Sequence, residues 1–400
     1  MTYDFTTLPD RWDDHAEKYE MMKQRCPDVP RGTVPFSVAD MDFLPPPELA
    51  EGLSAYFTGH VLGYTLTADS YYQAFTDWMR RRHGLELERE WLLDADSVIG
   101  AMHQMIRAFT QPGDEIIVMT PAYPPFLAAP DLLNRRRVDC PLKMDAQRRY
   151  QLEPDRLEEL CRSPRAKILL LSNPHNPVGR VWSRRELEDI AEICLRHQVF
   201  IISDEIHGDL IMPGYTCTSM ATLPEKYLAN CAVSTACTKT FNVAAIKGAV
   251  IIMQDAERRR LYAAQGTLPG RDILSYVAAE LLYRKGEPWL EQLLGVLDGN
   301  RRLMEDFLRA KLPEVGITPL EGTYLQWLDF RFLKFSPQEQ ERFMGEKAHC
   351  FFTEGYRFGE DGAGFERWNL ACPTKYVEEG LVRLKKTLDA ALAKKGAAVC

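Results

Sequence analysis

Residues 232–242 read AVSTACTKTFN and place Lys239 directly after a short apolar run. Two other phrases, SNPHNPVG at residues 172–179 and SDEIH at residues 203–207, also follow apolar runs. In a parallel sheet the carboxyl ends of the strands share one edge, and ligands bind beyond that edge. Because each phrase comes just after a predicted strand, we expect the three phrases to form one site.

Short apolar segments alternate with amphipathic ones through the middle of the chain. The apolar runs predict strands at 115–119, 167–171, 199–203, 232–236 and 249–253. The 3.6-residue period predicts helices at 69–82, capped by Asp69 and ended by Gly84, at 100–110 and at 183–196. Strands that are apolar throughout and alternate with helices are typical of an α/β protein with a mostly parallel sheet buried on both faces.

The character of the sequence changes near residue 288. A long amphipathic segment at 288–311 precedes a predicted strand, helix, strand and helix at 324–329, 337–347, 365–370 and 375–394. Residues 1–47 look irregular and end in three prolines, which do not fit a helix interior. We therefore expect a large α/β domain at 48–287 and a smaller α+β domain formed by 1–47 plus 288–400.

Composition excludes several classes of protein. The 400 residues carry a net charge of −8, which argues against a surface that binds nucleic acid. No apolar run approaches the roughly 18 residues of a membrane helix, and the first residues lack the pattern of a signal peptide. The ten cysteines form no C-x-x-C pair and no zinc-like cluster, so we expect a reduced, cytoplasmic protein without a metal.

Lys239, Asp204 and Asn176 together suit pyridoxal phosphate (PLP). A lysine forms a Schiff base with the cofactor aldehyde, and a buried aspartate keeps the pyridine nitrogen protonated. The rigid Asn-Pro turn can hold the Asn176 amide as a donor to the cofactor's phenolic oxygen. Taken singly, a surface lysine, a turn aspartate and a turn asparagine are the ordinary interpretations.

Other chemistries have weaker support. Cys237, two residues before Lys239, is a candidate nucleophile, but no base is identifiable beside it. Asp204, Glu205 and His207 offer metal-ligand types without a second cluster of suitable spacing. There is no G-x-G-x-x-G, no P-loop and no G-x-S-x-G motif.

With these residues in view, the chain resembles fold-type I PLP enzymes of the class I/II aminotransferase superfamily over essentially its whole length. Within it, the chain is most similar to bacterial C–S lyases of the cystathionine β-lyase type (the MalY/PatB family). Four phrases carry this narrower resemblance: VADMDF at 38–43, DEIH at 204–207, KTFN at 239–242 and EGTYLQWLD at 321–329. The implied fold is a mostly parallel seven-stranded sheet between helices, with a smaller α+β domain.

The resemblance implies roles around the cofactor ring. Lys239 is the residue that binds the cofactor and later transfers a proton, and Asp204 binds the pyridine nitrogen. Asn176 donates to the ring oxygen O3′, while Tyr123 stacks on the ring and counts among the catalytic residues. His207 stands among the cofactor-binding residues where many aminotransferases have tyrosine, which is the pattern of the C–S lyases.

The resemblance also implies a phosphate site. The backbone N–H groups of Val98 and Ile99 lie at a helix N-terminus, which favours an anion. Thr238 and Lys247 complete the site, and Tyr64 reaches it from a second subunit. Lys247 stands where aminotransferases usually have arginine, so it acts as a point charge rather than a fork. A second departure is Ala236, which lacks the hydroxyl of many relatives.

Substrate binding is implied for Arg367, Asp40 and Tyr64. Arg367 would clamp the carboxylate of an amino-acid substrate as a bidentate fork. The leading hypothesis is β-elimination from a cysteine S-conjugate such as cystathionine, by a homodimer with shared sites. An aminotransferase is the alternative, and a PLP-binding regulator that acts through protein contacts is the third hypothesis.

Overall fold

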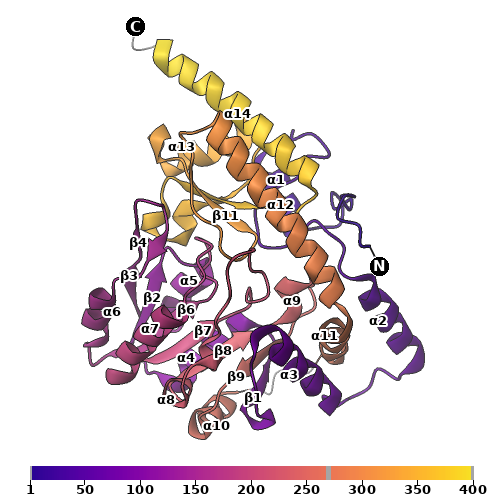
Figure 1. Ribbon diagram of the computed structural model, residues 1–400, viewed down its shortest axis with the longest axis vertical. Coiled ribbons are helices and arrows are strands. Elements are labelled where there is room, and N and C mark those ends of the chain that lie inside the picture. The colour runs from indigo at the N-terminus through magenta and orange to yellow at the C-terminus, as the bar shows by residue number, and fades with distance from the viewer. Residues whose placement is uncertain (1, 267–271, 398–400) are drawn as a thin grey trace.

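A seven-stranded sheet forms the centre of the computed structural model, which describes residues 2–266 and 272–397 (Figure 1). The order is β1-β9-β8-β7-β6-β2-β3, and only the two pairings made by β9 are antiparallel. The strands are β1 (Leu92–Ala95), β2 (Glu115–Thr120), β3 (Arg136–Pro141), β6 (Ala166–Ser172), β7 (Phe200–Asp204), β8 (Cys231–Thr235) and β9 (Ala249–Ile252). The predicted, mostly parallel sheet is confirmed.

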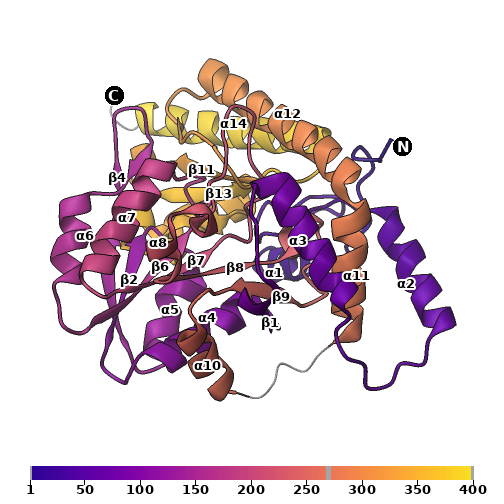
Figure 2. The ribbon, with the colours of Figure 1, turned by 60° about the horizontal axis from the view of Figure 1, so that its bottom comes forward.

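Helices cover both faces of this sheet (Figure 2). Alternate residues of β2 point to opposite sides, since Ile116 and Ile117 belong to two different hydrophobic clusters. One face packs on α4 (Val98–Phe109), α5 (Pro124–Leu132) and α10 (Ala256–Ala264). The other face packs on α6 (Pro154–Cys161), α7 (Arg184–Arg196), α3 (Asp69–His83) and α11 (Ile273–Lys285). Burial on both faces explains why the strands are apolar throughout.

A four-stranded antiparallel sheet stands beyond the first, in the order β10-β11-β13-β12. Its strands are β10 (Gly316–Ile317), β11 (Leu325–Asp329), β12 (Thr353–Glu354) and β13 (Phe365–Asn369). The helices α12 (Glu287–Lys311) and α14 (Thr374–Ala397) lie side by side over it, as both views show (Figures 1 and 2). The predicted division at residue 288 stays a prediction, although the change of sheet falls near it.

The expectation that residues 1–47 are irregular is wrong in one part. Helix α1 spans Glu17–Arg25 and buries Lys18, Tyr19 and Met22. No side chain caps it and its average hydropathy is low, so tertiary contacts rather than its own pattern stabilise it. Helix α2 (Pro47–Gly59) begins at the last of the three prolines, where proline suits the first helical turn.

Smaller differences concern element ends and edges. The helix predicted at 69–82 is α3, but its N-cap is Ala68 rather than Asp69, while Gly84 ends it at φ +64° as expected. The helix predicted at 337–347 is α13 (Pro337–Arg342) followed by a π-helical turn at Phe343–Lys347. The pattern of the sequence did not predict β1, the charged edge strand β3, or the hairpin strands β4 (Lys143–Met144) and β5 (Tyr150–Gln151). The remaining α-helices of the described residues are α8 (Glu225–Leu228) and α9 (Cys237–Thr240).

Candidate active site

Three adjacent strands end at the same edge of the large sheet. Ser172 at the end of β6 pairs with Asp204 at the end of β7, and Asp204 pairs with Ser234 near the end of β8. Lys239 lies one turn further on, in the short helix α9. The three phrases of the sequence therefore come together as predicted, because parallel strands carry their carboxyl ends to one edge.

Lys239 extends from α9 to the N-terminal segment. Its Nζ donates a hydrogen bond of 2.7 Å to the carbonyl oxygen of Ala39. Burial lowers the pKa of Lys239, and the charge of Arg367 lowers it further, while Asp40 and Asp204 act in the opposite direction. A lysine amine with a lowered pKa is suited to give and take a proton near neutral pH.

Asp204 and His207 lie beside this lysine at the end of β7. Burial raises the pKa of Asp204 to about 6, although its Oδ1 accepts a hydrogen bond of 3.0 Å from the N–H of Ile206. Burial also lowers the pKa of His207 to about 3, so its imidazole is neutral. The buried Nδ1 of His207 has no hydrogen-bond partner in the described part of the chain. A buried carboxylate that lacks a charged partner suits a cationic ring nitrogen.

Arg367 is buried in the small sheet and faces the same site. Its guanidinium donates to Asn176 Oδ1 at 3.0 Å and to Thr353 Oγ1 at 3.2 Å, and it lies over the ring of Phe358. Within the described residues its Nε has no partner. Burial lowers the pKa of Arg367 to about 10, so the side chain is cationic at neutral pH and available to an anion.

Tyr123 stands at the N-terminus of α5 and is partly buried. Burial raises the pKa of its phenol, the charge of Arg367 lowers it, and the carboxylate of Asp204 raises it again. Since both charges act on this phenol, the ring of Tyr123 belongs to the same group of side chains. The tyrosine is neutral, and its flat face is suited to stack on an aromatic ligand.

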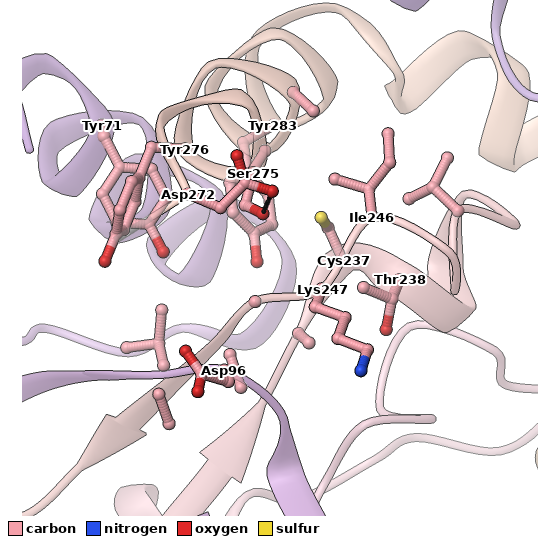
Figure 3. A pocket seen from close by; sticks show the side chains of 18 of the residues that line it. Tyr71, Asp96, Cys237, Thr238, Ile246, Lys247, Asp272, Ser275, Tyr276 and Tyr283 are labelled. Atoms are coloured by element: carbon pink, nitrogen blue, oxygen red, sulfur yellow. Dashed lines mark hydrogen bonds between the residues drawn. The ribbon is translucent and has the colours of Figure 1, made fainter. Parts of the chain in front are cut away.

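The expected phosphate side opens on a cavity of about 350 Å³ (Figure 3). Thr238, Lys247 and Asp96 line it, and Figure 3 shows Lys247 and Thr238 extending away from the tyrosines at its far wall. Helix α4 begins two residues after Asp96, and Ser97 Oγ caps it by accepting from the N–H of Gly100. The N–H groups of Val98 and Ile99 belong to the first turn, whose N–H groups have no partner within the helix.

These donors fit PLP. The edge of the sheet offers a buried carboxylate for a ring nitrogen, an amine for an aldehyde and an asparagine amide for a ring oxygen. The neighbouring cavity adds an ammonium, a hydroxyl and a helix N-terminus, which together suit a phosphate dianion. The unpartnered polar atoms of His207 and Arg367 show that this edge is a ligand site rather than a closed core.

Two predicted site residues are placed differently from the rest. The Asp40 carboxylate lies in a cluster of charges, at 2.8 Å from Arg11 and 3.1 Å from Lys18, with Asp42 as the second anion. Its own ion pairs therefore occupy it, and a contact with substrate stays a prediction. Tyr64 is fully exposed on the loop after α2 and meets none of the other site residues of its own chain.

The alternatives raised by the sequence find less support. Cys237 lines the cavity, but burial raises the pKa of its thiol to about 12, the opposite of what a nucleophile requires. Glu205 points away from Asp204, since Ser203 Oγ and the N–H of Met220 donate to it. No group of three or more potential metal ligands is found among residues 2–266 and 272–397.

Several residues of the site were missed from the sequence. Tyr324 donates to the same Ala39 carbonyl as Lys239, at 2.7 Å, although its phrase was noted without a role for it. Thr353, which accepts from Arg367, lies in a two-residue strand that carries no motif. Asn242 and Asn369 bind the backbone of the segment 37–43, and only tertiary structure brings them there.

Comparison with known proteins gives the family. Residues 31–384 match the aminotransferase class I and II family. The chain belongs to this family. This member is 34% identical over 359 residues to cystathionine beta-lyase PatB of Bacillus subtilis (strain 168), which covers 89% of this chain and 92% of that protein. It is 30% identical to protein MalY of Escherichia coli (strain K12), over 97% of this chain and 99% of that one.

A solved structure supports the same fold for this aminotransferase class I and II member. The crystal structure of cystalysin from Treponema denticola, which contains a pyridoxal 5′-phosphate cofactor, matches with a TM-score of 0.95. The two sequences are 40% identical, and the match covers 98% of this chain and 100% of that one. The resemblance to fold-type I PLP enzymes, and within them to C–S lyases of the MalY/PatB family, is confirmed.

Proposed function

We propose that this chain is a PLP-dependent C–S β-lyase, which cleaves cysteine S-conjugates to a thiol, pyruvate and ammonia. The observation that carries the proposal is the position of Lys239, a half-buried lysine whose pKa is lowered by burial and which feels the charges of both Asp204 and Arg367. Relatives named cystathionine beta-lyase match this chain over about nine-tenths of its length, which supports the C–S bond as the one that breaks.

The cofactor side of the proposal assigns one role to each group. Lys239 holds PLP covalently, Asp204 pairs with its ring nitrogen, and Asn176 donates to its ring oxygen. Tyr123 packs on the ring. His207 is neutral, so it adds no third positive charge beside those of Lys239 and Arg367.

The phosphate group of the cofactor would be bound by one ammonium and by neutral hydrogen-bond donors. Thr238, Lys247 and the N–H groups of Val98 and Ile99 bind the phosphate, because they surround or adjoin the cavity of about 350 Å³. The ammonium of Lys247 contributes charge without fixed geometry, and the hydroxyl and N–H groups contribute direction.

The chemistry follows from these positions. PLP, when bound, supplies an electron sink that stabilises negative charge at the substrate α-carbon. Arg367 binds the substrate carboxylate and so fixes which face of the α-carbon meets Lys239. The Lys239 amine takes the α-proton, the Cβ–S bond breaks with its electron pair leaving on sulfur, and the sulfur gains a proton to become a thiol. Water consumed afterwards completes the balance to pyruvate and ammonia.

Product analysis separates this function from that of an aminotransferase. The purified chain, supplied with PLP and L-cystathionine, is expected to release thiol and pyruvate in equal amounts over many turnovers. An aminotransferase would instead require a 2-oxo acid acceptor and return the substrate's carbon skeleton as a keto acid. A keto acid that still contains sulfur, formed only when the acceptor is present, would assign the alternative.

We also propose that the chain acts as a homodimer. Four apolar side chains are strongly exposed on the loop after α2: Val61, Leu62, Tyr64 and Leu66. Figures 1 and 2 show α2 and this loop at one edge of the molecule. Exposed apolar residues concentrated in so short a segment favour burial against a second subunit, where Tyr64 would reach the partner's phosphate site.

The location, the domain division and a regulatory role are further predictions that belong with this proposal. A cytoplasmic location is supported by the nine described cysteines, all of which are free thiols, most of them buried. The two-domain division at residues 47/48 and 287/288 is supported by the separate sheets. No helix in the described ranges is long and apolar enough to cross a membrane. A regulatory role through protein contacts stays a prediction that no contact here supports.

A further inference from the structure

One backbone carbonyl in the site serves two side chains. The oxygen of Ala39 accepts from Lys239 Nζ at 2.7 Å and from the Tyr324 hydroxyl at 2.7 Å. The three residues come from distant parts of the chain: the N-terminal segment, α9 and the approach to β11. The lysine amine and the phenol therefore meet at a single acceptor, and neither the mechanism nor the cofactor contacts described above use the phenol.

The carbonyl is held independently of these two donors. Asn369 Nδ2 donates to the carbonyl of Val38 at 3.1 Å and to that of Asp40 at 2.6 Å, on either side of Ala39. Asn242 binds the next residues, Met41 and Phe43, through three hydrogen bonds. Val38 has a φ of +59°, which is costly for a β-branched residue and persists only where the surroundings enforce it. The segment thus presents the Ala39 oxygen in a fixed direction.

Tyr324 is itself fixed. Its side chain is almost fully buried, and its ring packs edge-on against that of His207, with centroids 5.9 Å apart. The N–H of Leu370 is paired with the Tyr324 carbonyl, which ties the backbone to the strand end of β13. The hydroxyl of this fixed phenol donates to the Ala39 oxygen at 2.7 Å.

The charges that face Lys239 come from several elements. Asp40 in the N-terminal segment, Asp204 at the end of β7 and Glu17 in α1 favour its protonated form, while Arg367 in β13 and burial disfavour it. His207 is neutral and Tyr123 is an un-ionised phenol. These opposing effects make the proton on Lys239 sensitive to the hydrogen bond between its Nζ and the Ala39 oxygen.

We propose that Tyr324 is a positioning residue for Lys239. The Tyr324 hydroxyl donates to the same Ala39 carbonyl oxygen and so weakens the hydrogen bond between that oxygen and the protonated Lys239 amine. An oxygen that accepts from two donors binds each less strongly than it would bind one alone. Without the hydroxyl, the Ala39 oxygen accepts a stronger hydrogen bond from the Lys239 ammonium, which then releases its proton at higher pH. The inference rests on the proposed role of Lys239 as the group that moves the α-proton.

The direct test measures the amine itself. Full-length Tyr324→Phe and the unmodified chain, both without cofactor, are labelled with acetic anhydride across a range of pH, and the Lys239 peptide is quantified by mass spectrometry. The variant is expected to raise the pH of half-maximal labelling at Lys239 by about half a unit, a roughly threefold loss of neutral amine at a given pH. Phenylalanine keeps the ring and its contact with His207, so the fold is retained.

Tyr227→Phe is the matched control. Tyr227 is also buried, and its hydroxyl donates to Glu192 at 2.7 Å, far along the chain from the site. This control is expected to leave the labelling of Lys239 unchanged. An unchanged or lowered midpoint in Tyr324→Phe, or an equal rise in the control, would overturn the inference.

A second measurement uses the enzyme with PLP bound. Tyr324→Phe is expected to lower kcat roughly threefold at pH 7, to leave KM nearly unchanged, and to move the acid limb of the kcat profile to higher pH by the same half unit. A fall in kcat with no movement of the limb would mean a merely structural role and would also overturn the inference. Because labelling needs neither cofactor nor turnover, failure of the lyase proposal would leave the labelling result interpretable.

Discussion

At the scale of the residue, two carboxylates that lie a few positions apart in the chain, Asp204 and Asp209, have pKa values shifted in opposite directions. Burial raises the pKa of Asp204 to about 6, whereas in Asp209 the effect of burial is outweighed by hydrogen bonds and charge from His83, and its pKa is lowered. Asp209 also accepts from Thr240 Oγ1 at 2.8 Å and Trp78 Nε1 at 3.2 Å. Asp204 is thus a buried carboxylate without a cationic hydrogen-bond partner among the described residues, and the protonated ring nitrogen of the cofactor would be such a partner.

This difference predicts opposite effects on stability. Asp204 has a raised pKa in the folded chain, so its contribution to stability is full below pH 4 and is lost as the pH rises through about 6. Without cofactor, Asp204→Asn should therefore raise the free energy of unfolding at pH 7.5 by about 2 kcal/mol and change it little at pH 4. Urea denaturation at the two pH values measures this.

Asp209→Asn serves as the contrasting variant. Its lowered pKa contributes stability that is present above the unfolded pKa and lost as the pH falls, so this variant should destabilise the chain at pH 7.5. Equal destabilisation by both substitutions at pH 7.5 would contradict the account of Asp204. Asp204→Asn should in addition weaken the binding of PLP, because the amide offers no charge to the ring nitrogen.

Arg367 gives the second residue-scale prediction. Its planar guanidinium already binds Asn176 and Thr353 and has Nε left over, a geometry that an ammonium does not reproduce. Arg367→Lys should raise KM for the amino-acid substrate about tenfold or more, with a smaller change in kcat. Arg156→Lys, on the surface of α6, is the control. A KM that stays the same in Arg367→Lys would remove the proposed carboxylate contact.

At the scale of the element, the N-terminal segment 37–43 depends on side chains from elsewhere. Asn369 at the end of β13 bridges two of its carbonyls, and Asn242 after α9 bridges two more. The segment therefore connects the small sheet with the helix that carries Lys239. Movement of this segment would displace the acceptor of the catalytic lysine.

Asn369→Ala tests this connection. Loss of the amide leaves the carbonyl of Val38 without its donor and that of Asp40 with Lys18 Nζ alone, at 3.1 Å, at a cost of about 2 kcal/mol in the free energy of unfolding. Activity should fall further than stability explains, since the Ala39 acceptor moves. Asn230→Ala removes one hydrogen bond, from the side-chain amide to the carbonyl of Val199, away from the site. This variant should lower stability while leaving kcat unchanged. Equal losses of kcat in both variants would contradict the link.

Prediction from sequence succeeded where local pattern and function coincide. The strands of the parallel core are apolar throughout and the strand ends carry rare phrases, so the sheet and the grouping around Lys239 could be predicted. Helix α1 could not, because its polar sequence gains its stability from tertiary contacts. Thr353 lies in a two-residue strand without a motif, and Asn369 ends β13, the predicted strand that carries Arg367; only the folded chain shows what these two side chains bind. The ion pairs of Asp40 were likewise hidden, because Arg11 and Lys18 are distant in sequence.

At the scale of the whole molecule, the loop after α2 exposes several large apolar side chains. Val61 is 90% exposed and Leu66 is 82% exposed, on the loop that also carries Tyr64. If the chain forms the proposed dimer, the double variant Val61→Asp/Leu66→Asp should convert it to a monomer in sedimentation velocity experiments and reduce activity at least tenfold, because Tyr64 would no longer reach a second site.

Val382→Asp is the matched control for this surface. Val382 is 57% exposed on α14, on a different part of the molecule, and its replacement should leave a dimer with full activity. A monomeric unmodified chain with full activity would contradict the proposal that the site is shared between subunits.

Lys239 is the residue to which we assign β-elimination at a C–S bond. The most direct measurement is the simultaneous release of thiol and pyruvate from L-cystathionine by the PLP-loaded chain and by Lys239→Ala. We predict equal amounts of the two products from the unmodified chain, and a loss of at least a thousandfold in the variant, which removes both the attachment point and the base. Comparable thiol and pyruvate release by Lys239→Ala would contradict the account.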